Sequence, residues 1–252
     1  MASLRLENVT LEYPVLDSIR NKFSANLEKA KLVGGRLQQS VNNKAKVVAL
    51  NNISLALNDG DRLALLGHNG SGKTSLLKTM SGFYQPSAGQ VLRQGRLASV
   101  LNMVSGLRMN LSSDENVDLA LQVAGIDKLE RSKLKLEILT HSQLGEFTSL
   151  PISKLSSGML MRLAFYLSTM TKPDILLLDE WVGVGDLAFI DKASERLASM
   201  VEGSGIVVYA THNRTIAAKL CNKAVCLHRG EIIAHGEVKS VCDQYTDIMQ
   251  GR

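Results

Sequence analysis

The stretch GHNGSGKT, residues 67–74, decides the fold. It matches the pattern G-x-x-x-x-G-K-[ST], in which backbone N–H groups fold around a phosphate and the next helix directs its positive end at it. The pattern needs a strand before it and a helix after it, and the sequence predicts a buried strand at Arg62–Leu66 and a helix at Thr74–Ser81. Lys73 is expected to reach the β- and γ-phosphates of a nucleotide, and Thr74 to ligate Mg²⁺. His68 stands at a variable position of the pattern, and no chemical role is expected for its side chain.

A second apolar run supplies the acids that a phosphate loop needs. Ile175–Leu178 reads as a buried strand and ends in Asp179 and Glu180. Asp179 is expected to reach Mg²⁺ through water, and Glu180 to polarise the water that attacks the nucleotide. The alternative reading is a strand followed by two solvated acids.

Length and composition exclude several classes of protein. The chain has 252 residues, 45% hydrophobic and 21% charged, which fits one α/β unit with an appendage and excludes disordered, collagen-like and disulfide-rich proteins. No uncharged apolar run approaches the roughly 18 residues that a membrane span needs, and the N-terminus has no apolar signal-peptide core. The three cysteines form no C-x-x-C pair, which indicates free thiols in a reducing cytosol.

The excess positive charge is concentrated in one segment. The net charge is +5, and residues 15–48 hold seven basic side chains and two acidic ones. This favours a local anionic partner such as a membrane surface over a nucleic-acid track. An inserted, basic amphipathic helix is expected within residues 14–46, because apolar residues recur there at the spacing of one helix face: Leu16, Ile19, Phe23, Leu27 and Ala30. Such a helix can lie on lipid headgroups, dock on a partner helix, or pack on its own sheet as an ordinary surface helix.

The rest of the chain alternates strands and helices. Further strands are predicted at residues 4–13 and Ile206–Ala210, a strand pair at Val47–Leu57, and a hairpin around Arg229-Gly230. Helices are predicted within residues 112–150, at Ile190–Glu202 and at Val238–Met249. Continuous apolar strands that alternate with helices indicate an α/β fold whose parallel sheet is covered on both faces.

One further motif resembles a known family. Residues 155–159 read LSSGM, with Arg162 three residues further on, and they open a predicted helix shortly before Asp179. The chain here resembles the ATP-binding cassette (ABC) ATPases, whose signature reads L-S-G-G-Q followed by an arginine; Ser157 and Met159 depart from it. The helix N-terminus, expected from Met159 onward, would offer Ser156 and backbone N–H groups to an anion. In the family, that anion is the γ-phosphate held by the other copy in a head-to-tail dimer.

The resemblance implies a fold and further site residues. The fold is a P-loop NTPase of the ABC ATPase type, one domain over residues 1–252 with a parallel-sheet core, an antiparallel β subdomain and a helical signature subdomain at about 112–166. Asp186 matches the family's dimer-contact aspartate, His212 its switch histidine at the γ-phosphate, and Tyr13 its adenine-stacking aromatic residue. Asn102 stands near the position of a glutamine that contacts the metal. The expected catalytic residues are Glu180 and His212, and the expected metal contacts are Thr74, Asp179 and Asn102. The expected nucleotide contacts are Tyr13, Gly67, His68, Asn69, Gly70, Ser71, Gly72, Lys73, Thr74, Ser75, Asn102, Ser156, Ser157 and Gly158.

Less specific sequence features resemble one subfamily of these ATPases, the subunits that export polysaccharides. These features are the loop at 96–107, the D-E-N-V run at 114–117, the V-G-D run at 184–186 and the insertion. The resemblance implies an ATPase, dependent on ATP and Mg²⁺, that moves lipid-linked polysaccharide (O-antigen, capsule or teichoic acid) across the cytoplasmic membrane. It would work as a homodimer with separate transmembrane permease subunits, peripheral to the cytoplasmic face of the inner membrane, with no nucleic-acid partner. The chain ends at Arg252, so no C-terminal carbohydrate-binding domain is expected.

Three alternatives stay open at this point. The chain could serve another transporter, or act as a soluble cassette ATPase on ribosomes or nucleic acid, although such proteins usually carry two cassettes or a coiled-coil insertion. It could also hold ATP without hydrolysing it. Asn102, Ser157 and Met159 motivate that reading, whereas Lys73, Glu180 and His212 argue against it.

Overall fold

The computed structural model describes residues 1–14, 36–39, 45–101, 103–179 and 187–249, and these fall into two compact units. The core unit comprises Met1–Leu97, Asp174–Glu180 and Gly205–Arg252. The helical unit comprises Ala98–Pro173 and Trp181–Ser204. The amphipathic helix expected within residues 14–46 lies outside the described residues.

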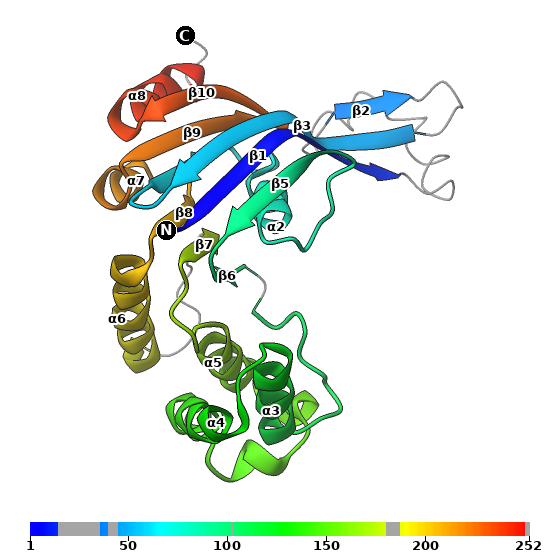
Figure 1. Cartoon of the computed structure of the whole chain (residues 1–252), viewed down its shortest axis with the longest axis vertical. Helices are drawn as coiled ribbons and strands as arrows, with labels where there is room; N and C mark the ends of the chain where they lie inside the picture. Colours follow the sequence, from blue (N-terminus) through cyan, green and yellow to red (C-terminus); the bar gives the residue numbers. More distant parts are fainter. Residues whose placement is uncertain (15–35, 40–44, 102, 180–186, 250–252) are drawn as a thin grey trace. The chain divides into compact units, whose positions relative to one another are not determined.

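An antiparallel sheet forms one layer of the core unit (Figure 1). Its order is β2-β3-β1-β5, and its strands are β1 (Ser3–Pro14), β2 (Arg36–Gln39), β3 (Ala45–Asn58) and β5 (Ala88–Gln94). The strand pair predicted at Val47–Leu57 is wrong, because β3 is a single strand that pairs with β1 from Lys46 to Asn58. Asn52 has φ +52° where the pairing skips residues of β3. Asparagine tolerates this left-handed backbone, so β3 continues through a bulge at this residue.

A mostly parallel sheet forms the other layer and positions the site. Within the core unit its order is β10-β9-β4-β8-β7. The strands are β4 (Arg62–Leu66), β7 (Ile175–Asp179), β8 (Ile206–Ala210), β9 (Lys223–His228) and β10 (Glu231–Glu237). All adjacent pairs from β9 to β7 are parallel, and β10 closes an antiparallel hairpin with β9. The side chains of β4, β7 and β8 are buried almost throughout, which confirms the buried strands that the sequence predicts. The antiparallel pairing of β9 with β10 confirms the predicted hairpin around Arg229-Gly230.

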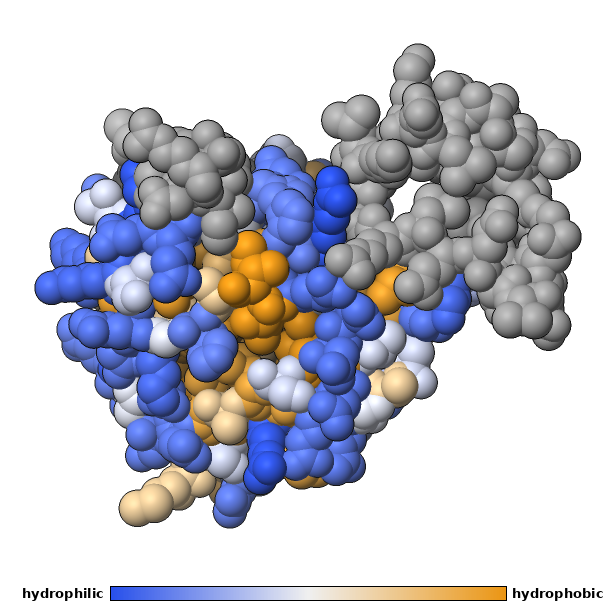
Figure 2. All heavy atoms as spheres, turned by 90° about the horizontal axis from the view of Figure 1, so that it is seen from above, coloured by the Kyte–Doolittle hydropathy of each residue, from blue (hydrophilic) through white to orange (hydrophobic). Residues whose placement is uncertain are grey.

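Helices α2 (Lys73–Met80), α7 (Arg214–Leu220) and α8 (Val238–Met249) complete the core unit. Helix α8 contacts β4, β9 and β10, and α2 contacts β7 and β8. A groove of about 1030 Å³ is lined by residues of β3, β4, β9 and β10. Seen from above, the surface carries apolar side chains at its centre among mostly polar ones (Figure 2).

The helical unit is built from short helices around an apolar centre. Strand β6 (Leu97–Val100) leads into it, followed by α3 (Ser113–Val123), α4 (Lys128–Ser142), the 3₁₀ turns η2 (Gly145–Ser149) and η3 (Ile152–Lys154), α5 (Ser157–Ser168) and α6 (Leu187–Gly203). Helix α4 contacts both α3 and α5. The buried side chains include Val117, Leu121, Ile138, Leu163 and Phe165. None of the described helices is long and apolar enough to cross a membrane.

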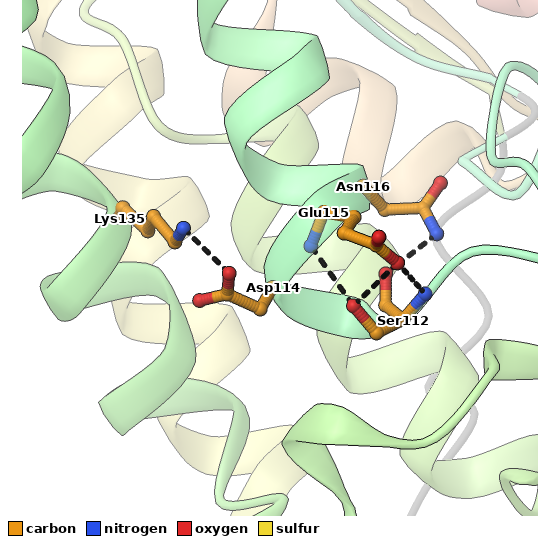
Figure 3. Close-up of polar contacts among 5 residues, drawn as sticks. All are labelled: Ser112, Asp114, Glu115, Asn116 and Lys135. Carbon is orange, nitrogen blue, oxygen red and sulfur yellow. Dashed lines mark hydrogen bonds and ion pairs between the residues drawn. The ribbon is translucent and has the colours of Figure 1, made fainter.

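Helix α3 begins with a capping box (Figure 3). The Ser112 hydroxyl accepts a hydrogen bond from the Glu115 N–H at 3.1 Å, and the Glu115 carboxylate accepts one from the Ser112 N–H at 2.8 Å. Lys135 of α4 donates to Asp114 at 2.7 Å, which ties the two helices together. The capping box gives partners to two N–H groups, those of Ser112 and Glu115, that a helix start otherwise leaves unpaired.

The loop before α3 is held by one buried amide. Asn116 is 2% exposed, and its Oδ1 accepts from the Arg108 N–H at 2.7 Å. Its Nδ2 lies within hydrogen-bond distance of the carbonyl oxygens of Arg108 (3.0 Å), Leu111 (3.2 Å) and Ser112 (2.8 Å). Residues 108–112 lie outside any helix or strand. The Asn116 side chain therefore supplies hydrogen-bond partners for several of their backbone groups.

Candidate functional site

The phosphate loop connects β4 to α2, and two of its glycines are required by the geometry. Gly72 caps α2 with φ +111°, and Gly67 has φ +149°. A Cβ on Gly67 would overlap the Ser71 hydroxyl and lie 2.5 Å from the carbonyl oxygen of Leu227. The start of α2 has neither a side-chain cap nor an acidic residue in its first turn. Its N–H groups and its positive dipole end are therefore suited to an anion.

Lys73 is a buried cation held by the loop itself. Its side chain is 7% exposed, and Nζ donates to the carbonyl oxygens of Gly67 at 2.7 Å and His68 at 3.2 Å. Buried charges require compensation by charged or hydrogen-bonded partners. An anion at the loop would give Lys73 a full counter-charge, in agreement with the expected phosphate contact.

The expected metal ligands of β7 and α2 lie together. Thr74 Oγ1 donates to Asp179 Oδ2 at 2.7 Å, although the two residues are 105 positions apart. The strand register explains this meeting, because Asp179 of β7 and Leu65 of β4 both pair with Ala210 of the intervening β8. Hydroxyl and carboxylate oxygens are hard ligands that Mg²⁺ prefers, so this donor pair fits a magnesium ion shared with nucleotide phosphates.

His212 follows β8 at the same edge of the sheet. The Thr211 N–H donates to the Leu65 carbonyl oxygen at 3.1 Å, which fixes the chain at this point beside the strand that leads into the phosphate loop. The next residue, His212, is exposed. Carboxyl ends of parallel strands are where ligands bind in open α/β sheets, so the phosphate loop, Asp179 and His212 share one such edge.

Tyr13 lies beside the first turn of α2. Its ring meets that of Tyr84 edge to face, with centroids 5.6 Å apart. Burial raises the pKa of the Tyr13 hydroxyl, and a hydrogen bond with Ser75 opposes that shift. Tyr13 as a whole is half-buried.

The signature residues belong to the helical unit and start a helix earlier than the sequence predicts. Helix α5 begins at Ser157, not at Met159, because Ser156 is the N-cap and its hydroxyl accepts from the Met159 N–H at 3.2 Å. Ser156 and Ser157 are exposed, and a Cβ on Gly158 would meet no atom within 4 Å. The first turn of α5 carries no acidic residue, so its N–H groups can face an anion.

Three expected site residues lie outside the described residues: Asn102, Glu180 and Asp186. The sequence analysis missed a different group, which supports the phosphate loop from the β9–β10 turn. The Gly230 N–H donates to the Ser71 carbonyl oxygen at 2.9 Å, and the Gly230 carbonyl oxygen accepts from the Asn51 N–H at 2.8 Å. His228 contacts His68 in the same area. The hairpin is visible in the sequence, but its contact with the loop about 160 residues earlier has no local signal.

A phosphate loop on a parallel sheet, with an aspartate from a neighbouring strand against its threonine, defines a P-loop nucleoside triphosphatase. Comparison with known proteins narrows this class. The family described as ABC transporter matches residues 50–183. The chain is 41% identical to the O-antigen export system ATP-binding protein RfbE of Yersinia enterocolitica, over 92% of this chain and 97% of that protein. It is 31% identical to the teichoic acids export ATP-binding protein TagH of Staphylococcus epidermidis, over 96% of this chain and 88% of that protein.

Solved structures agree on the fold. The chain is similar to a dimeric, post-hydrolysis structure of the ATP-binding cassette MJ0796 bound to ADP and Pi, with TM-score 0.66, 22% identity, and coverage of 93% of this chain and 98% of that one. A structure of an ATP-binding subunit of an ABC transporter gives a TM-score of 0.68 at 20% identity, over 96% of this chain and 93% of that one. The chain belongs to the ABC transporter family, and it is an ATP-binding ATPase of that family. The family and the fold class predicted from the sequence are confirmed.

Proposed function

We propose that this chain is the ATPase subunit of an exporter of lipid-linked polysaccharide. The observation that carries the proposal is the 41% identity to an O-antigen export subunit over nearly the whole of both chains. The chain is also similar to a teichoic acids export ATP-binding protein, which favours polysaccharide as the class of cargo over any one glycan. An ATPase subunit of this kind requires separate transmembrane permease subunits as partners. The chain would act on the cytoplasmic face of the membrane.

The described residues suit the ATPase part of this role. Lys73 and the loop N–H groups bind the β- and γ-phosphates, and Thr74 and Asp179 hold Mg²⁺. When bound, Mg²⁺ neutralises charge that develops on the transferred phosphoryl group. Glu180 follows Asp179 directly in the chain, and we assign it the general-base role toward the attacking water. His212, at the same sheet edge, contacts the γ-phosphate.

A second copy of the chain completes the site. Ser156, Ser157 and Gly158 offer the start of α5 to the γ-phosphate held by the other copy, and Asp186 contacts that copy. Asn102 contributes a contact to the metal. The insertion within residues 14–46 contacts the permease or the membrane surface near the permease. No nucleic-acid partner is part of the proposal.

The experiment compares export in cells that carry single variants at parental abundance. Lys73→Ala should leave lipid-linked polysaccharide inside the cell and remove it from the surface, because the variant cannot bind the triphosphate. Lys239→Ala is the matched control, since Lys239 is an exposed lysine of α8 in the same unit. The chain should also sediment with membranes only when its permease is present. Normal surface polysaccharide in the Lys73→Ala strain would refute the proposed function.

A further inference from the structure

Two histidines from distant parts of the chain meet at the phosphate loop. His68 is the second residue of the loop, and His228 is the last residue of β9, 160 positions later. His68 Nε2 lies 3.2 Å from His228 Nδ1, and the ring centroids are 5.1 Å apart at an interplanar angle of 70°. Both rings are half-buried. The family pattern requires neither histidine, because the second position of the loop accepts any residue.

The contact acts directly on the backbone that binds phosphate. The carbonyl oxygen of His68 accepts from Lys73 Nζ at 3.2 Å and from the Ser71 N–H at 3.1 Å. The same hairpin that carries His228 also donates from the Gly230 N–H to the Ser71 carbonyl oxygen. The β9–β10 turn therefore holds the loop at two points, once through the backbone and once through the histidine pair.

The neighbouring hydrogen bonds determine where the protons of the pair lie. His68 Nδ1 is 2.7 Å from the carbonyl oxygen of Asn69, and a carbonyl oxygen only accepts, so Nδ1 carries a proton. In the neutral His68 ring, Nε2 is therefore an acceptor. His228 Nδ1 must then be the donor in the bond between the rings.

This bond tolerates one added proton but not two. A proton on His228 Nε2 leaves the bond as it was. A proton on His68 Nε2 turns that atom into a donor, and His228 accepts at Nδ1 in its other tautomer. With two added protons, an N–H group on each ring faces the other ring, and the hydrogen bond is lost.

Three charged residues lie near the pair in the backbone. Lys73 comes from α2, Arg229 follows His228 in the turn, and Glu231 of β10 is the cross-strand partner of His228. The Cys226 thiol, two residues before His228, stays neutral because burial raises its pKa to about 11.

We propose that His228 is a positioning residue for ATP: it fixes the phosphate loop through His68, and a second proton on the pair releases the loop and weakens ATP binding. The pair thus makes nucleotide affinity depend on pH.

The test measures the Kd for ATP by calorimetry between pH 5.5 and 8, with EDTA present so that no ATP is hydrolysed. At pH 7.5, His228→Ala should bind ATP about fivefold more weakly, as expected for one lost hydrogen bond between uncharged groups. His228→Asn should restore most of the affinity, because an amide can donate to or accept from His68 Nε2. The matched control is His235→Ala, which removes an exposed histidine from the same hairpin.

The pH profile separates a positioning role from a merely structural one. The parent should lose affinity toward pH 5.5, whereas His228→Asn should lose much less, because the amide keeps its bond in every charge state of His68. His228→Ala binding ATP as tightly as the parent at pH 7.5 would overturn the proposal. So would a His228→Asn protein with the parent's full loss of affinity in acid, and this second result does not depend on whether His228→Ala folds.

Discussion

Replacing Gly67 by alanine tests how tightly the phosphate loop is built. The added Cβ would overlap the Ser71 hydroxyl and approach the Leu227 carbonyl oxygen to 2.5 Å. A side chain at φ +149° costs about 1–3 kcal/mol in backbone strain. Moving the crowded loop and β9 apart adds about 1–3 kcal/mol. Gly67→Ala should therefore lower the free energy of unfolding by about 2–6 kcal/mol, a large part of the roughly 5–15 kcal/mol that such domains have.

Gly236→Ala is a matched control for the backbone strain alone. Gly236 has φ +146°, and a Cβ there would meet no atom within 4 Å. Equilibrium unfolding in urea, followed by far-UV circular dichroism, should show that Gly67→Ala loses about 1–3 kcal/mol more than Gly236→Ala. Calorimetry should show weaker ATP binding for Gly67→Ala only. Equal losses of stability in the two variants would refute the reasoning, because steric overlap at the loop would then contribute nothing.

Three further predictions concern stability and thiol reactivity. Asn116→Ala should lower the free energy of unfolding of the helical unit by about 2–4 kcal/mol, because it leaves several backbone groups without partners. As a control, replacing the exposed Asn110 by alanine should change this free energy by less than about 0.5 kcal/mol. Urea titrations measure both changes. Ser112→Ala should cost about 1 kcal/mol through loss of the capping box, and an unchanged urea midpoint would contradict this. Burial raises the pKa of Cys221 to about 12 and of Cys226 to about 11, so the thiolate fraction of each at pH 8 is small. Compared with free cysteine, Cys226 should react with a disulfide reagent roughly 200-fold more slowly and Cys221 roughly 2000-fold more slowly, and rapid reaction of either thiol in the native protein would contradict the burial.

The sequence predicts the parts of the fold that have local signals. The strands at Arg62–Leu66, Ile175–Asp179 and Ile206–Ala210 are short, continuous and apolar, because parallel strands are covered on both faces. Glycines that accept positive φ mark the phosphate loop. The thiols of the three cysteines are free, as expected, and all are buried.

Features that depend on partners elsewhere in the chain were not predicted. Strand β5 (Ala88–Gln94) is mostly exposed and has no apolar alternation, so only its pairing with β1 makes it a strand. The sequence predicts a strand pair at Val47–Leu57, but pairing with β1 carries β3 as one strand through a bulge at Asn51-Asn52. The contact between His68 and His228 joins residues 160 positions apart, and no pattern within either segment indicates it.

The central claim is that this chain hydrolyses ATP at the site formed by the phosphate loop, Asp179 and Glu180. The most direct test is the ATP hydrolysis rate of purified Glu180→Gln with Mg²⁺, compared with the parent at nucleotide concentrations where both are saturated. Loss of a general base lowers such rates about 10²- to 10⁴-fold, so the variant should bind ATP normally and turn it over at least about 100-fold more slowly. Glu202→Gln, at an exposed glutamate, serves as the control. A Glu180→Gln protein that hydrolyses ATP at the parental rate would contradict the claim.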